Sequence, residues 1–536
     1  MSNQLLHKYR VLTEGISELY TFQKEAITSL LNGQNTLCIA PTGKGKSIIY
    51  QLAAQELDGL TIVVSPLTAL IKEQVNILRE AGVNAIGITS DISFQDQRIL
   101  LRNFSINPPK ILFLSPERLQ NSFFRAAILR SVLKVNMVVV DEAHCVSQWG
   151  IDFRPEYGQI EEFIEFITNN GLKPVTLALT ATLGIKARND IIEAYQISPS
   201  AVFIEKSFIR SELHLNFIEV DEEFEKEEKI YELLELAKIK KAIIYFYSVN
   251  RCRKIAEKLS QKGYTVGQYY SAMDSEEKED VYEQYITGEI TILCATTAFG
   301  MGMNIPDIDT IIHYHIPNSI EEYYQQVGRA ARDKRLCSIA NCYLLWSEKN
   351  FDYKIEEHIE PQQLSLERIN ESFKKFGLEG NANKIQAVEY SNYSAQNLSF
   401  FRYLLEKNGA LRFIGEVNGT PKSIKFKEEN LYWNTIVERM EFGNNFVRAA
   451  EKSQLSLQEL INYIFDQELS GKIKTFKALE KKLFFVSDYD EVPIDIAYEI
   501  IEASMAIVEF KTTQLKALQK MIKSAQPEKE IYEYFN

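Results

Sequence analysis

The sequence lacks the usual marks of a secreted or membrane protein. Its six cysteines stand apart with no CxxC pair, which fits a reducing compartment better than a disulfide-stapled fold. The opening stretch "MSNQLLHKYRVL" has no apolar core of a signal peptide, and no apolar run approaches the length that spans a bilayer. We therefore expect a cytoplasmic protein with no membrane partner.

Net positive charge is also missing. The formal net charge is −13 and the pI about 5.3, a balance that argues against nucleic-acid binding, which needs lysine and arginine to neutralise phosphates. Local clusters of basic residues can override the total. Much of the acid lies in the block "VDEEFEKEEKIYELLELAKIKK" (Val220 to Lys241), which predicts a solvated helix or linker. Specific motifs must therefore decide whether nucleic acid is a partner.

Short apolar runs that end in polar residues dominate most of the chain. The runs "NTLCIA", "GLTIVVSP", "KILFLSP", "VNMVVVDE" and "VTLALTAT" predict buried parallel strands, and the pattern resumes at "KAIIYFYS", "ITILCATTAFG" and "DTIIHYHIP". We expect an α/β fold with two tandem parallel-sheet domains, residues 1–206 and 207–357, followed by a mostly helical region, 358–536. Ligands of such sheets gather where the strands end, and the polar residues lie there.

A phosphate-binding loop is predicted by "CIAPTGKGKSIIYQLAAQEL", which places a glycine-rich turn between a strand and a helix. Backbone N–H groups of this turn can converge on phosphate oxygens, Lys46 can reach the outer phosphates, and Ser47 can bind Mg²⁺. The first glycine of the usual pattern is Ala40 here, and a lone GKS is often accidental. The residues predicted to hold the nucleotide in this loop are Thr42, Gly43, Lys44, Gly45, Lys46 and Ser47.

Two adjacent acids follow the apolar run "MVVV". Asp141 can hold Mg²⁺, and Glu142 can orient and deprotonate the attacking water. The alternative is an acid pair that caps a helix, which the upstream loop makes less probable. Further along, Arg329 and Arg332 in "EYYQQVGRAARD" are three residues apart and are predicted to share a helix face. They can stabilise charge on a transferred phosphoryl group, whereas the alternative is a surface basic pair.

With these residues in place, the chain resembles superfamily 2 helicases, and among them the RecQ-like family, from about Leu19 to Trp346. The motifs occur in the family's order: "APTGKGKS" (motif I), "SPLTALIKEQV" (Ia), "DEAH" (II), "ALTAT" (III), "TTAFGMGMNIPD" (V) and "QQVGRAAR" (VI). "CVSQWGIDFRPEY" resembles the aromatic-rich loop that separates RecQ-like enzymes from DEAD-box and DEAH-box RNA helicases. The resemblance implies two RecA-like domains and an enzyme that hydrolyses ATP with Mg²⁺, moves 3′ to 5′ on single-stranded DNA and opens forked duplex DNA.

The resemblance also assigns roles to individual residues. Gln23 reads the adenine edge and Tyr20 stacks on the ring. In the aromatic-rich loop Trp149 and Phe153 stack on bases, and a buried aromatic cluster is the alternative. The catalytic residues are Lys46, Asp141, Glu142, Gln325, Arg329 and Arg332. Those that face DNA are Ser65, Pro66, Trp149, Phe153, Arg154, Thr296, Gly300 and Gly302. Those that couple the two sites are His144, Thr180 and Thr182, with His144 linking motifs of the two domains.

The sequence departs from the family pattern mainly on the DNA side. Tyr20 replaces the usual arginine of motif 0, Ile151 the histidine of the aromatic-rich loop, and Val249 the arginine of motif IV. Tyr270 replaces the histidine of "YHAG", Ile305 the lysine of "NKP", and Ala331 the middle glycine of "GRAGR". The family's zinc module is not visible, because no CxxC occurs and the apolar alternation of "RLCSIANCYLLW" predicts that Cys337 and Cys342 lie in the last strand of the second domain. We therefore expect no structural zinc, and the departures bear on duplex unwinding more than on ATP hydrolysis, whose residues are intact.

The last third of the chain carries weaker signals. The helix "NLSFFRYLLEKNG" and an Asn418-Gly419 hairpin are more typical of an ordinary helix–hairpin packing unit than of a winged-helix variant that grips duplex DNA, although Lys422, Lys425 and Lys427 give the second interpretation some charge. A docking site for a protein partner is a further alternative. For the whole chain, a DNA helicase is the leading hypothesis. A DNA-stimulated ATPase switch in a larger complex and an RNA helicase are the others.

Overall fold

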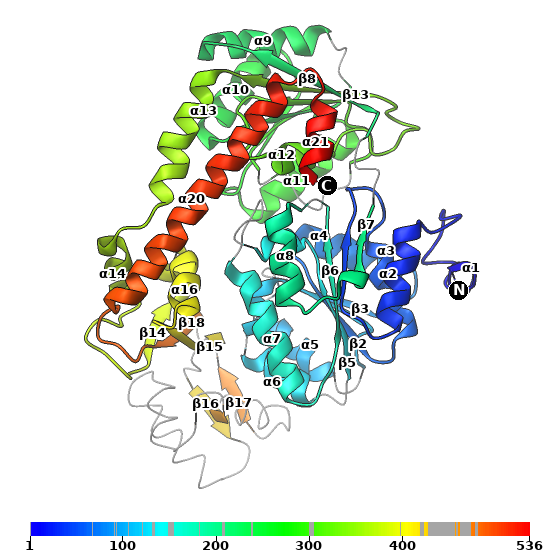
Figure 1. Ribbon diagram of the computed structural model, residues 1–536. Coiled ribbons are helices and arrows are strands. Elements are labelled where there is room, and N and C mark those ends of the chain that lie inside the picture. The colour runs from blue at the N-terminus through cyan, green and yellow to red at the C-terminus, as the bar shows by residue number, and fades with distance from the viewer. Residues whose placement is uncertain are drawn as a thin grey trace.

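The computed structural model describes residues 2–535 with internal gaps, and it confirms the predicted α/β class with two parallel sheets and a mostly helical carboxyl-terminal region (Figure 1). The gaps are 67, 90, 91, 93, 105, 106, 121, 131–133, 148–154, 182, 206–209, 237–239, 298, 300–304, 397, 419–422, 427–455, 457, 458, 461–472 and 477–480. No described helix has the length and apolar character that a bilayer crossing requires.

The first sheet has seven parallel strands and forms the centre of the amino-terminal domain, which extends to the end of β7 and is called lobe 1 below; the domain built on the second sheet is called lobe 2. In spatial order they are β3 (Ala85–Ile88), β4 (Ile111–Leu114), β2 (Leu60–Val64), β5 (Val135–Val140), β6 (Val175–Thr180), β1 (Thr36–Ile39) and β7 (Val202–Ile204). Alternate residues of each strand enter a core on each face, so that Leu37 and Ile39 pack on one side while Cys38 packs on the other. Its helices are α1 (Ser2–Lys8), α2 (Thr21–Leu31), α3 (Ser47–Glu56), α4 (Thr68–Glu80), α5 (Phe94–Asn103), α6 (Ser122–Arg130), α7 (Gly158–Asn169) and α8 (Ile185–Ala194). Short 3₁₀ turns are η1 (Pro116–Gln120), η2 (Ala143–Cys145), η3 (Pro155–Tyr157) and η4 (Pro199–Ala201).

The second sheet has six parallel strands and forms the centre of lobe 2. In spatial order they are β10 (Val266–Tyr269), β11 (Ile292–Ala295), β9 (Ala242–Tyr245), β12 (Thr310–His313), β13 (Ala340–Trp346) and β8 (Leu213–Glu219). The covering helices are α9 (Glu223–Leu236), α10 (Val249–Gln261), α11 (Ser275–Thr287) and α12 (Ile320–Val327). Cys342 lies in β13, as the alternation of its neighbours predicts, and it is fully buried. The placement of Cys337 in the same strand is wrong, because its N–H donates to the Asp333 carbonyl in the turn that precedes β13.

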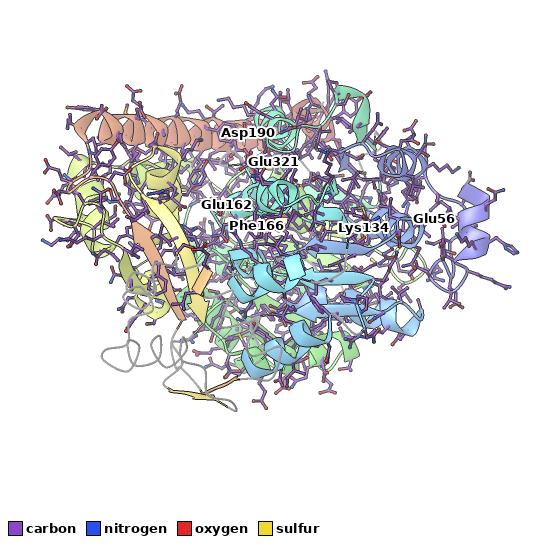
Figure 2. The ribbon with its side chains drawn as sticks, turned by 90° about the horizontal axis from the view of Figure 1, so that it is seen from below. Glu56, Lys134, Glu162, Phe166, Asp190 and Glu321 are labelled. Carbon is purple, nitrogen blue, oxygen red and sulfur yellow. The ribbon has the colours of Figure 1, made fainter. Side chains whose placement is uncertain are left out.

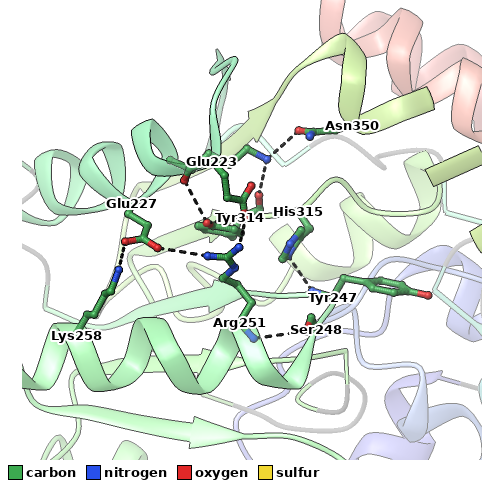
Figure 3. Close-up of polar contacts among 10 residues, drawn as sticks. Glu223, Glu227, Tyr247, Ser248, Arg251, Lys258, Tyr314, His315 and Asn350 are labelled. Atoms are coloured by element: carbon green, nitrogen blue, oxygen red, sulfur yellow. Dashed lines mark hydrogen bonds and ion pairs between the residues drawn. The ribbon is translucent and has the colours of Figure 1, made fainter. Parts of the chain in front are cut away.

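The acidic block forms α9, which is less solvated than its charge suggests. Ile230, Leu233 and Leu234 pack into the core of lobe 2, and Lys226 is 2% exposed. The Lys226 ammonium donates to the Tyr314 carbonyl at 3.2 Å and to Asn350 Oδ1 at 2.8 Å. Figure 3 labels the two residues that accept these bonds, Tyr314 and Asn350. These bonds join α9 to the end of β12.

The carboxyl-terminal region leaves lobe 2 and later returns to it. Its helical part comprises α13 (Glu348–Lys354), the π-helical η5 (Ile355–Ile359), η6 (Glu360–Gln362), α14 (Leu366–Lys375), α15 (Tyr390–Ala395), α16 (Leu398–Lys407), α20 (Ile494–Lys523) and α21 (Pro527–Phe535). Its strands are β14 (Gln386–Glu389), β15 (Arg412–Asn418), β16 (Ser423–Phe426), β17 (Ile473–Phe476) and β18 (Lys481–Val486). Helix α20 crosses the molecule diagonally from this region to lobe 2 (Figure 1).

The predicted hairpin at Asn418-Gly419 is wrong. Gly419 itself lies outside the described residues, but the described strands on either side of it belong to different sheets: β15 pairs with β18, and β16 pairs with β17. The physical reason is burial. On β18, Leu483 and Phe485 enter the core of the carboxyl-terminal region, while Phe484 enters a core of lobe 1. Of the three lysines named for this region, Lys422, Lys427 and the side chain of Lys425 lie outside the described residues.

Candidate nucleotide site between the two lobes

The predicted phosphate-binding loop joins the end of β1 to the start of α3. Gly43 and Gly45 have φ angles of 83° and 65°, in the left-handed region that glycine adopts at little cost. The loop therefore sits at a helix N-terminus, where backbone N–H groups and the helix dipole favour an anion.

Lys46 lies between this loop and the two acids. Its ammonium donates to the Ala40 carbonyl at 2.7 Å and to the Pro41 carbonyl at 3.4 Å. Loss of solvation lowers its pKa, while Glu142 and Asp141 act in the opposite direction because their carboxylates are near. The structure thus brings together the three residues that the two motifs predicted to act on a phosphate.

Gln23 contacts the phosphate-binding loop directly. Its Nε2 donates to the carbonyls of Lys44 at 3.1 Å and Gly45 at 2.9 Å, and its Oε1 accepts from the Tyr20 N–H at 2.8 Å. The side chain braces the loop, and its role toward adenine stays a prediction. Tyr20 is 49% exposed, stacks on Phe22 at 5.7 Å between ring centroids, and has the Lys44 ammonium 5.1 Å from its ring.

The two acids follow β5 and are held by their surroundings. Ser65 Oγ donates to Asp141 Oδ2 at 3.2 Å, the Glu142 N–H donates to Asp141 Oδ1 at 3.1 Å, and Tyr157 donates to the Asp141 carbonyl at 2.8 Å. Burial first, and then the charge of Glu142, raise the pKa of Asp141. A bound cation would favour the ionised form of such a carboxyl group.

Glu142 and His144 connect this acid pair to motif III. Glu142 has φ 50°, a left-handed conformation that is strained for a residue with a side chain. His144 Nδ1 lies 3.4 Å from Glu142 Oε2 and 3.1 Å from Thr180 Oγ1. These contacts join two motifs of lobe 1, and the role of His144 between the lobes stays a prediction. Thr182 lies outside the described residues.

The expectation that Arg329 and Arg332 share a helix face is wrong. Gln325 lies in α12, but this helix ends at Val327, and the two arginines lie in the turn after it. Helix geometry stops because Ala331 has φ 49° and its N–H donates to the Ile308 carbonyl at 2.9 Å.

Arg210 holds this turn from the side, although nothing in the sequence motifs marked it. Its Nη1 donates to the Gly328 carbonyl at 2.9 Å and its Nη2 to the Ala331 carbonyl at 2.5 Å. The turn that carries the arginines is therefore fixed by tertiary hydrogen bonds.

The turn faces the phosphate-binding loop across the two lobes. A Cβ placed on Gly328 would lie 3.1 Å from Thr42 Oγ1, so that the lobes touch at this point. Arg332 is near enough to Lys46 to lower the pKa of that lysine. Burial first, and then Arg329 and Arg210, lower the pKa of Arg332 to about 10. Such a concentration of cations is what a bound polyphosphate would neutralise.

Some of the residues that are predicted to face DNA belong to the described part of the chain. Ser65 is 1% exposed and bonds to Asp141, Pro66 comes directly after it, and Thr296 follows β11 with its N–H donating to the Tyr269 carbonyl at 3.0 Å. Tyr270 accepts from Arg253 Nε at 2.9 Å and from its Nη2 at 2.6 Å. Val249 begins α10 and Ile305 is buried. The predicted residues outside the described part of the chain are Trp149, Ile151, Phe153, Arg154, Gly300 and Gly302.

All six cysteines are buried, and none of them forms a disulfide within the described part of the chain. Within the described part of the chain, no group of three or more His, Cys, Asp or Glu side chains is placed to hold a metal ion. The expectation of no structural zinc stays a prediction.

Comparison with known proteins agrees with this geometry. Residues 20–191 match the DEAD/DEAH box helicase domain, and residues 225–334 match the helicase conserved C-terminal domain. Among solved structures, a crystal structure of the DUF1998 helicase MrfA bound to DNA and AMPPNP aligns with a TM-score of 0.53 at 19% identity, over 67% of this chain and 51% of that chain. At this identity the likeness concerns the fold alone.

Curated relatives are closer in sequence. ATP-dependent DNA helicase RecQ of Haemophilus influenzae is 37% identical over 318 residues, which are 58% of this chain and 49% of the relative. RecQ of Bacillus subtilis is 34% identical over 376 residues, 68% of this chain and 62% of the relative. The chain thus spans about half to three fifths of the length of these relatives. Probable ATP-dependent DNA helicase RecS of Bacillus subtilis is 32% identical over 358 residues, 66% of this chain and 69% of the relative. Together with the two domain matches and the motif geometry, this extent of similarity shows that the chain belongs to the RecQ-like family of superfamily 2 helicases.

Proposed function

We propose that this chain is an ATP-dependent DNA helicase, which uses Mg²⁺-ATP hydrolysis to move 3′ to 5′ along single-stranded DNA and to open a forked duplex. The observation that carries the proposal is the meeting of the lobes at one site. Lys46, Asp141 and Glu142 of lobe 1 lie together, and Arg332 of lobe 2 is close enough to Lys46 to alter its pKa.

The residues present fit a magnesium-bound triphosphate. Gly43 and Gly45 are left-handed and carry no side chain over their backbone N–H groups, and Arg329 Nε is buried with no hydrogen-bond partner among the described atoms. Ser47 and Asp141 would hold Mg²⁺, which neutralises phosphate charge when bound.

The other side chains then have distinct roles. Lys46 would exchange its bonds to the loop carbonyls for phosphate oxygens. Glu142 would orient the attacking water and accept its proton. Arg329 and Arg332 would stabilise charge on the transferred group, an effect of roughly 10³–10⁵ in rate where such residues have been studied.

A DNA substrate is supported by the family membership and by one contact. Ser65, at the start of motif Ia, bonds directly to the proposed magnesium ligand Asp141 at 3.2 Å. A DNA strand bound by motif Ia would therefore contact a residue, Ser65, that is itself bonded to the hydrolytic site. Relatives named as DNA helicases support the same substrate.

A DNA-stimulated ATPase switch is the second candidate. It is favoured by the carboxyl-terminal region, which packs Phe484 and Leu460 into lobe 1 and Leu515 and Leu518 into lobe 2. A region tied to both lobes restricts how far they can separate. It is also the part of the chain that we propose for contact with a protein partner.

The test is a strand-separation assay on duplexes with a 3′ or a 5′ single-stranded tail, run beside ATP hydrolysis with DNA or RNA oligonucleotides. We expect Mg²⁺-dependent opening of the 3′-tailed duplex, stimulation by DNA over RNA, and affinity that falls steeply with salt. Lys46→Ala and Glu142→Gln should abolish hydrolysis, whereas Lys24→Ala, which removes a surface ion pair to Glu18, should not. Activity that survives both site variants would refute the assigned site, and stimulated hydrolysis without strand separation would support the switch.

A further inference from the structure

The last two helices of the chain pack on the helix that leads into the arginine turn. Leu515, Leu518, Met521 and Ile522 of α20 and Ile531 and Phe535 of α21 share one core with residues of α12. Helices α12 and α20 are in direct contact. The carboxyl-terminal helices therefore form part of lobe 2, directly behind motif VI.

One buried carboxylate on α12 joins these helices to the boundary between the lobes. Glu321 is 3% exposed, and its Oε1 accepts from the Tyr534 hydroxyl at 2.6 Å. Gln514 of α20 donates from Nε2 to the same hydroxyl at 3.4 Å. The other oxygen, Oε2, is buried and makes no hydrogen bond within the described part of the chain.

The same carboxylate faces lobe 1. Its Oε1 lies 3.2 Å from the position of a Cβ on Gly184, the residue that caps the start of α8. Gly184 offers no side chain for capping, and the first turn of α8 contains no acid. Burial raises the pKa of Glu321, and the hydrogen bond from Tyr534 acts in the opposite direction. In its ionised form the carboxylate places a negative charge from the other lobe beside the N-terminus of α8, where such a charge is favourable.

Helix α8 also contacts α20 and the start of the aromatic-rich loop. The Lys186 ammonium lies 5.3 Å from the centroid of the Phe510 ring of α20. Further along, Asp190 accepts from Ser147 Oγ at 2.5 Å, one residue before the undescribed segment 148–154. Figure 2 labels Asp190 on α8 and Glu321 on α12, with the long α20 running along one edge of the molecule.

We propose that Glu321, held by Tyr534, is a positioning residue that transmits closure of the two lobes to the first turn of α8 and, through Asp190, to Ser147 beside motif II. The inference rests on the proposed function and deepens it. When the lobes are together, the carboxylate stabilises the first turn of α8, and α8 in turn holds Ser147 at the root of the loop. Helices α20 and α21 keep the carboxylate in place.

The first test measures how strongly single-stranded DNA stimulates ATP turnover in the full chain. Tyr534→Phe and Glu321→Gln should each lower the ratio of stimulated to basal turnover about threefold or more, while Tyr534→Phe keeps basal turnover. The double variant should be no worse than the more impaired single variant, because both changes break one bond. Tyr532→Phe, on the exposed side of the same helix, is the matched control.

The second test needs no activity. Amide hydrogen exchange in the first turn of α8 should rise about fivefold in Tyr534→Phe and stay unchanged in Tyr532→Phe. Unchanged exchange in Tyr534→Phe, or stimulation equal to that of the unmodified chain, would overturn the inference. A failure of the proposed function looks different, because the unmodified chain itself would then show no DNA-stimulated turnover.

Discussion

Replacing Ala331 with glycine tests whether the turn that carries the two arginines is strained. Ala331 has φ 49°, a conformation that costs an L-residue about 1–2 kcal/mol and glycine almost nothing. Tertiary bonds impose it, since the Ala331 N–H donates to Ile308 and its carbonyl accepts from Arg210. The glycine that the family has at this position is thus replaced by a residue that fits the turn less well.

The neighbouring Ala330 is a matched control for the magnitude. Both side chains are fully buried, and only Ala331 of the two has a positive φ. Either change to glycine loses a buried methyl group, about 0.8 kcal/mol, and adds freedom to the unfolded chain, about 0.4–1 kcal/mol. Ala330→Gly should therefore cost about 1.2–1.8 kcal/mol, whereas in Ala331→Gly the relief of strain offsets most of this loss.

Native-state hydrogen exchange is a suitable assay, because it reports the opening of lobe 2 separately from the rest of a multidomain chain. The slowest amides of β12 and β13 should be roughly 5- to 30-fold better protected in Ala331→Gly than in Ala330→Gly, which corresponds to about 1–2 kcal/mol. Equal loss of protection in the two variants would refute the assignment of strain to Ala331.

Three further changes test other parts of the structure. Gly328→Ala places a methyl group 3.0 Å from the Tyr324 carbonyl oxygen of its own lobe and 3.1 Å from Thr42 Oγ1 of lobe 1. The two tight contacts should together cost about 1 kcal/mol or more, seen as at least a roughly fivefold lower ATP turnover, and Thr42→Ser, which keeps the hydroxyl, should leave that loss unchanged; turnover equal to that of the unmodified chain would mean that the lobes do not meet here. Tyr157→Phe leaves the buried Asp141 carbonyl without its 2.8 Å bond, so that unfolding becomes easier by about 1–3 kcal/mol and hydrolysis needs more Mg²⁺; an unchanged Mg²⁺ titration would contradict this role. Burial lowers the pKa of Lys226 to about 8, below the 10.5 of an unfolded chain, so the folded state binds this proton less tightly and stability should rise as the pH increases from 8 to 10.5. Lys226→Met should lack that component, and parallel stability curves for the two proteins in urea titrations would refute it.

The strands were predictable because their signal is local. Each of the eight apolar runs named from the sequence, "VNMVVVDE" among them, contains a strand of one of the two sheets. Residues buried on both faces of a parallel sheet must be apolar in succession, and the run ends where polar residues meet the ligand edge. The turn between β1 and α3 and the position of the acid pair at the end of β5 were predictable for the same reason, since each motif is defined by neighbours in sequence; their binding of a nucleotide stays a prediction.

The arginine turn and the Asn418-Gly419 hairpin were not predictable from spacing. A spacing of three residues in the sequence is the same whether or not the helix continues through both of them. Here the chain leaves helical geometry, because Gly328 accepts a hydrogen bond from Arg210 and Ala331 donates one to Ile308, both distant in sequence. The preference of Asn-Gly for a hairpin turn is local and contributes little free energy. Strand β15 pairs instead with β18, whose Phe484 and Phe485 bury large rings on the two faces of β18.

The sequence by itself determined the two sheets, the loop and the acids, because short-range order in residue type is enough to specify a buried strand and the polar turn at its end. Only the tertiary structure decided what the last two helices do. The periodicity of α20 and α21 shows that they have an apolar face, but any apolar surface could cover it. Their packing on α12, and the contact of Glu321 with Tyr534 and with the start of α8, depend on which surfaces the fold brings together.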